Sequence, residues 1–132
     1  MRRIVFLFII IGLITHLQSI SQGTFHEVGN DDIQNQSNTY PSIYGNYYRG
    51  VKNQFLIKAS EMQAAGMLAG NITGLAFDVI TSSGATLEDL QIEIKSTSQT
   101  SITIWDDNNL NSVYGPVNYV DQTGWNQHDF NA

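Results

Sequence analysis

The sequence of 132 residues contains no cysteine. Without thiols the chain has no disulfide framework, no cysteine nucleophile, no thiolate metal ligand and no N-terminal cysteine for lipid attachment. A fold of this length must then take its stability from its apolar core.

Basic residues are also scarce, with six Lys and Arg against twelve Asp and Glu, for a net charge of −6. Two of the six are Arg2 and Arg3, so without these two the net charge would be −8. Binding to phosphate backbones rests on clustered Lys and Arg, and the sequence shows no such cluster. We therefore expect no nucleic-acid partner.

No apolar run is long enough to span a membrane. The longest, residues 4–14, covers eleven residues or about 16 Å of helix, against a hydrocarbon core of about 30 Å. Arg2 and Arg3 precede this run, and the small residues Ser19 and Ser21 follow it. This order predicts a signal peptide over residues 1–21, cleaved after Ser21, and a secreted or cell-surface protein without membrane insertion after cleavage.

The rest of the chain reads as a polar leading segment, residues 22–39, and a single domain, residues 40–132. We expect the leading segment to be a mobile stretch or an edge strand. The domain has short segments of alternating apolar and polar residues that predict strands, at residues 54–58, 72–80, 87–95, 102–105, 113–121 and 125–130. We therefore expect a mainly β protein, an antiparallel β-sandwich of jelly-roll-like form. Because the chain ends at the last strand, we expect it to be a truncated piece of a longer protein.

Two features interrupt the strand pattern. Ser60 and Gln63 have the spacing of a capping box, and Gly66 can end the helix in a left-handed conformation, which predicts one short α-helix near residues 60–66. Pro116 cannot donate a hydrogen bond to a strand ladder, which predicts an edge position or a bulge.

Taken in order, several short runs of the chain resemble a repeated β-sandwich module of large surface proteins exported by type IX secretion. The runs that carry the resemblance are Tyr40-Pro41, Tyr44-Gly45-Asn46-Tyr47-Tyr48, Gln54-Phe55-Leu56, Ala59-Ser60-Glu61, Ala64-Ala65-Gly66, Gly70-Asn71-Ile72, Leu75-Ala76-Phe77-Asp78-Val79, Val113-Tyr114-Gly115-Pro116 and Gly124-Trp125-Asn126-Gln127-His128. The resemblance implies further β domains and a sorting domain in the same polypeptide. It brings no catalytic residue with it.

Residues for catalysis are few. No Gly-x-Ser-x-Gly motif occurs. His26 lies in the leading segment, and we interpret His128 as an ordinary strand residue. Asp89 and Glu93 share a strand face, but four residues of strand separate them by about 13 Å, whereas glycosidase carboxyl pairs lie roughly 5 to 9.5 Å apart. The sequence therefore predicts no enzyme, and a secreted hydrolase is the most distant alternative.

Two groups of residues could bind a ligand. Asp106, Asp107 and Asn109 supply oxygen ligands of the kind that calcium prefers, although a plain polar turn explains them more simply. The aromatic residues Tyr44, Tyr47, Tyr48 and Trp105 could stack on a sugar, or could instead cover one end of the sandwich. We favour the second interpretation.

The sequence thus favours a non-catalytic extracellular β-sandwich module with a structural or adhesive role. Its expected partners are other domains of the same polypeptide, with glycans or surface polymers as further partners. A carbohydrate-binding module that uses the tyrosine loop is the first alternative. No cofactor is expected, with calcium the one ligand ion kept open.

Overall fold

The computed structural model describes residues 24–29, 42–45, 47 and 49–131. The predicted signal peptide, most of the leading segment, and the aromatic residues Tyr40 and Tyr48 lie outside the described residues. In the described part of the chain, no helix has the length and apolar character needed to cross a membrane.

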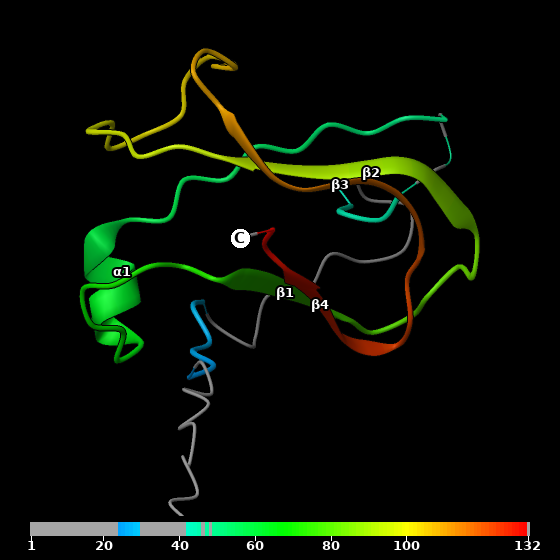
Figure 1. The fold of residues 1–132 in the computed structure, drawn as a ribbon, viewed down its shortest axis with the longest axis horizontal. Coiled ribbons are helices and arrows are strands. Elements are labelled where there is room, and N and C mark those ends of the chain that lie inside the picture. Colours follow the sequence, from blue (N-terminus) through cyan, green and yellow to red (C-terminus); the bar gives the residue numbers. More distant parts are fainter. Residues whose placement is uncertain (1–23, 30–41, 46, 48, 132) are drawn as a thin grey trace, which may run out of the picture.

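Two antiparallel sheets of two strands each form the fold. Strand β1 (Gly74–Val79) pairs with β4 (Gly124–Asp129), and β2 (Thr86–Ile94) pairs with β3 (Asn111–Val120). Figure 1 shows the β2–β3 pair as one layer and the β1–β4 pair as the other, with the helix α1 (Ala59–Ala64) beside them. The predicted mainly β, sandwich-like fold with one short helix is confirmed. The nested pairing is that of a long hairpin folded over on itself, the arrangement found in jelly rolls.

The alternation in β1 and β4 decides which residues face the other layer. Leu75 lies opposite His128, and Phe77 lies opposite Asn126. Residues directly opposite each other in an antiparallel pair point to the same face. The polar residues His128 and Asn126 therefore share the inner face with the apolar side chains of β1, and both are buried.

Strands β2 and β3 pair with irregular register. The register shifts on both sides of Leu90, and Asp89 adopts a positive φ of 56°. Gly115 has a φ of 73°, and a Cβ at this position would collide with the carbonyl oxygen of Leu90. The bulge predicted next to Pro116 is thus observed in this pair, and it requires glycine at residue 115.

Two of the expected strands are absent from the sheets. Residues 54–58 and 102–105 are not assigned to any strand, so the prediction of strands there is wrong. Alternation shows which face of an extended segment is apolar, but a strand also needs a neighbouring backbone to pair with. Neither segment has a backbone–backbone hydrogen bond to the described residues, apart from the bonds of Lys58 to the helix.

The helix begins one residue before the predicted cap. Lys58 is the N-cap, and its backbone N–H donates to Oε2 of Glu61 at 2.6 Å, so the predicted cap at Ser60 is wrong. A carboxylate at the third helical position is the stronger acceptor near the positive end of the helix. The predicted stop is correct, because Gly66 has a φ of 86° and its N–H donates to the carbonyl oxygen of Gln63 at 2.9 Å.

The described part of the leading segment, residues 24–29, is not a strand but contacts both the helix end and β4. The Phe25 ring meets the Trp125 indole edge-on, with centroids 4.9 Å apart. Nδ1 of His26 lies 2.9 Å from the carbonyl oxygen of Ala65.

Candidate functional site

The most buried side chain of the described residues is a histidine. His128 on β4 is 1% exposed, and the rings of Tyr114 and Tyr119 on β3 meet its ring at centroid distances of 4.7 and 4.8 Å. The hydroxyl of Tyr44 lies 2.6 Å from Nε2 of His128. We call His128 with these three tyrosines the histidine centre.

Burial fixes the protonation states in this centre. Desolvation lowers the pKa of His128 below its ordinary value, and the nearby Asp129 carboxylate only partly offsets this. Burial, followed by Tyr119 and Asp121, raises the pKa of Tyr44 well above that of a free tyrosine. At neutral pH the imidazole is therefore uncharged and the Tyr44 hydroxyl keeps its proton.

One nitrogen of this histidine has no partner. Nδ1 of His128 is buried and makes no hydrogen bond to any of the described residues. A general base in a triad has a third group that orients its second nitrogen, and the described neighbours supply none here. His128 lies in a strand, as interpreted from the sequence, and its ring is packed on the inner face between the two layers.

Asn126, two residues before His128, anchors the turn between β3 and β4. Its Oδ1 accepts hydrogen bonds from the Tyr119 hydroxyl and the Gln122 N–H, both at 2.8 Å. Its Nδ2 donates to the carbonyl oxygens of Gln122 at 2.6 Å and Gly124 at 2.8 Å. This amide therefore uses both its oxygen and its nitrogen, and it is 3% exposed.

Asp121 lies in the same turn and is also buried. Its backbone carbonyl accepts a hydrogen bond from the Ser82 hydroxyl at 2.7 Å, which ties the turn after β3 to the turn after β1. One carboxylate oxygen, Oδ1, is buried without a hydrogen-bond partner among the described residues. Asp121 and His128 are thus two buried groups, each with an unpaired polar atom.

The loop that follows Trp105 is held by bonds of its own. Asp106 pairs with the Lys95 ammonium at 2.7 Å through Oδ2, and its Oδ1 accepts from both the backbone and the side chain of Asn108 at 3.2 Å. The hydrogen bond from Lys95, then those from Asn108, hold the pKa of Asp106 below its usual range. The Gln54 amide bonds to the Asp106 backbone in both directions, which places residues 54–58 next to this loop.

For calcium, the positions of the three predicted ligands are now known. Asp106 is engaged with Lys95 and Asn108, Asp107 is exposed, and Asn109 has a φ of 57°. Within the described ranges no cluster of three or more His, Cys, Asp or Glu side chains is placed to hold a metal ion. A calcium ion would have to displace the Lys95 ammonium to use Asp106, and calcium binding stays a prediction.

The four aromatic residues considered for sugar stacking differ in their exposure to solvent. Tyr44 is 7% exposed and belongs to the histidine centre, whereas Tyr47 is 78% exposed and Tyr48 lies outside the described residues. Trp105 is 46% exposed, and the Lys52 ammonium lies 5.3 Å from its ring centroid. A sugar-stacking surface would therefore use Tyr47 or Trp105 and not Tyr44.

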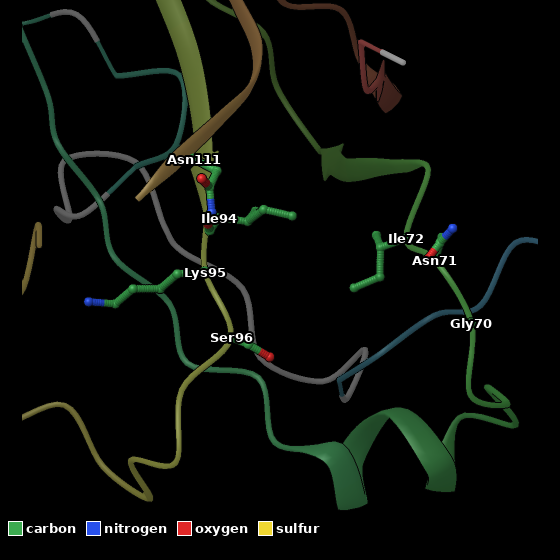
Figure 2. Close-up of a pocket in the computed structure, with 7 residues that line it drawn as sticks. All are labelled: Gly70, Asn71, Ile72, Ile94, Lys95, Ser96 and Asn111. Atoms are coloured by element: carbon green, nitrogen blue, oxygen red, sulfur yellow. Dashed lines mark hydrogen bonds between the residues drawn. The ribbon is translucent and has the colours of Figure 1, made fainter. Parts of the chain in front are cut away.

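A pocket of about 400 Å³ lies between the segment before β1, the end of β2 and the start of β3. Figure 2 shows Ile72 and Ile94 reaching into this space from opposite sides, while Lys95 points away from it. Gly70 and the uncharged polar residues Asn71, Ser96 and Asn111 complete the wall.

The sequence alone could indicate which of these residues face the interior, but not which of them contact one another. The 126, 128, 130 alternation of β4 could have placed Asn126 and His128 inside, since Trp125 and Gln127 take the other face and are exposed. No sequence signal indicates that Tyr44 reaches His128, because 84 residues separate them.

No family model, no curated protein and no solved structure matches the chain. The geometry of the chain is therefore the basis for its functional assignment.

Proposed function

We propose that the chain is a non-catalytic β-sandwich module of a larger secreted or surface protein, with a structural or adhesive role. The observation that supports this proposal is a row of exposed apolar side chains on the two extended segments outside the sheets. We call this row the apolar seam; its members are Phe55, Ile57, Ile102, Ile104 and Trp105, which are 58%, 44%, 39%, 77% and 46% exposed.

The two segments that carry the seam are fastened to each other. Gln54 bonds to the Asp106 backbone from one side, and Lys52 lies over the Trp105 ring. Contiguous exposed apolar surface in a folded protein commonly marks a contact with another protein or domain. A neighbouring domain of the same polypeptide would bury the seam and explain its composition.

A photo-crosslinking phenylalanine analogue at Ile104 tests this proposal in the secreted protein. We expect cross-linked peptides from another domain of the same polypeptide, identified by mass spectrometry. The analogue at Thr103, an exposed neighbour that is not part of the seam, is the matched control. Equal and low cross-linking at residues 103 and 104 would contradict a domain contact at the seam.

The export route is tested separately. If the signal peptide functions as proposed, tagged protein recovered outside the cytoplasmic membrane begins at Gln22. Recovery of the chain in the cytoplasm with Met1 to Ser21 still attached would refute export.

Carbohydrate binding is the second candidate, and the exposed Trp105 ring favours it. Aromatic faces suit the flat apolar faces of sugars. On an array of polysaccharides we expect binding that Trp105→Ala removes and that Tyr44→Phe, a change in the core, leaves unchanged. Binding that survives both Trp105→Ala and Tyr47→Ala would exclude this role for the aromatic residues.

A further inference from the structure

The contact between the two sheets depends on a small number of side chains. Within each sheet the strands lie close along their length, whereas strands of different sheets have little backbone contact in the described chain. The inner faces meet at His128, whose ring lies between β4 and the tyrosines of β3. Further ties are the Tyr119–Asn126 hydrogen bond and the hydrogen bond from the Asn131 N–H to the Val113 carbonyl oxygen, both at 2.8 Å.

His128 is the one group among these ties that changes charge near neutral pH. The ordinary pKa of histidine is about 6.5, whereas tyrosine hydroxyls and amides stay uncharged in mildly acidic solution. A proton on His128 would place a positive charge on a side chain that is 1% exposed. Burying an unpaired charge is costly, so the charged ring favours any conformation that returns it to water.

The groups that face the His128 ring do little to stabilise a positive charge on it. Around it lie three uncharged tyrosines: Tyr44 from the loop, and Tyr114 and Tyr119 from β3. The carboxylate of Asp129, exposed on the same strand, acts on His128, whereas the buried Asp121 in the turn after β3 acts on Tyr44 and Tyr119. Opposite His128 on β1 stands the apolar Leu75.

Hydrogen bonding also limits the protonated ring. A charged imidazole has two N–H donors, and Tyr44 can accept from Nε2. The second donor, Nδ1–H, finds no acceptor among the described residues in the present arrangement. In the closed packing the neutral ring therefore leaves one polar atom unpaired. The charged ring leaves an N–H donor unpaired and also buries a positive charge that Asp129 only partly offsets.

We propose that His128 is a pH-sensitive latch between the two sheets, which holds them together while it is neutral and releases the β1–β4 sheet when it is protonated. Release would expose the inner apolar faces of both sheets, including Phe77 on β1. The module would then present a larger apolar surface in a mildly acidic setting than in a neutral one.

The direction of the effect follows from the pKa of His128, which burial holds below the ordinary value. The open form, with the ring in water, binds a proton more readily than the closed form. The closed form is therefore fully stable above pH of about 6.5 and is disfavoured as the pH falls below it. Carboxylates with ordinary pKa values near 4 respond at lower pH, which separates their effect from that of the latch.

The test follows opening of the full exported chain from pH 7.5 to pH 4.5. Binding of a dye that fluoresces on apolar surface reports opening, and NMR of the His128 ring reports protonation. We expect both signals to change together between about pH 6.5 and pH 5. His128→Gln, which keeps an acceptor for the Tyr44 hydroxyl, should move the opening at least one pH unit lower, whereas His26→Gln should leave it unchanged.

Three results would overturn the latch. The first is opening that is unchanged in His128→Gln, and the second is a ring that takes up its proton while the dye signal stays flat. The third is opening while the ring is still neutral. The last two are read on the native protein, so the proposal can be decided even if the variant does not fold.

Discussion

At the scale of single residues, the inner face of this protein is unusual in its polarity. The side chains most removed from water are His128, Asn126, Asp121 and Tyr44, not aliphatic residues. Buried polar groups stabilise a fold when their hydrogen bonds are complete, and they weaken it when an atom is left unpaired. Asn126 belongs to the first kind, whereas His128 and Asp121 belong to the second.

Asn126 should therefore contribute strongly to stability. Asn126→Ala removes four hydrogen bonds, among them those to the Tyr119 hydroxyl and the Gln122 backbone. It leaves their partners unpaired, so we expect a loss of about 2–4 kcal/mol of unfolding free energy, measured by urea denaturation. Gln127→Ala, at the exposed neighbouring position, should change it by less than about 0.5 kcal/mol. Equal effects of the two variants would mean that the amide does not anchor the turn.

At the scale of elements, alternation predicted all four strands of the two sheets, but it also predicted two strands that are absent. Alternation over residues 87–95 and 113–121 gave β2 and β3 within two residues at each end. Residues 54–58 and 102–105 show the same alternation but have no partner strand, and pairing is a tertiary property that local sequence does not contain. The histidine centre could not be predicted for the same reason, because its residues come together only through the tertiary arrangement of both sheets.

A substitution at the bulge of the β2–β3 pair can show how much the pairing of these strands depends on one glycine. In Gly115→Ala the new Cβ would collide with the Leu90 carbonyl oxygen, at a φ of 73°. Gly84→Ala is the matched control, because Gly84 has a similar φ of 65° but nothing within 4 Å of a Cβ.

We expect Gly84→Ala to cost about 1–2 kcal/mol from backbone strain alone. Gly115→Ala should cost clearly more, because the backbone of β2 must move to relieve the collision. Urea unfolding of both variants gives the difference. If the two midpoints fall by the same amount, the close approach of Gly115 to β2 is not a determinant of the pairing.

At the scale of the whole molecule, an acidic protein with exposed apolar surface faces two opposing effects. A net charge of −6 repels other copies, while the seam residues, Ile104 at 77% exposure among them, favour association. Salt screens the repulsion but not the apolar attraction, with a Debye length of about 8 Å at 0.15 M. We expect the isolated chain to associate more as salt is added, and sedimentation velocity measures this.

The seam, and not apolar exposure in general, should decide that association. Ile104→Ser should reduce the sedimentation coefficient at 0.5 M salt toward that of the monomer, with little change in unfolding free energy because the side chain is already in water. Leu68→Ser is the control, since Leu68 is 91% exposed but follows the helix and lies outside the seam. Isoleucine and leucine side chains have similar apolar areas, so both substitutions remove a similar apolar surface. A difference between the variants therefore reflects where the side chain lies. If Leu68→Ser has the same effect as Ile104→Ser, the seam is ordinary exposed surface and no domain contact needs to be inferred from it.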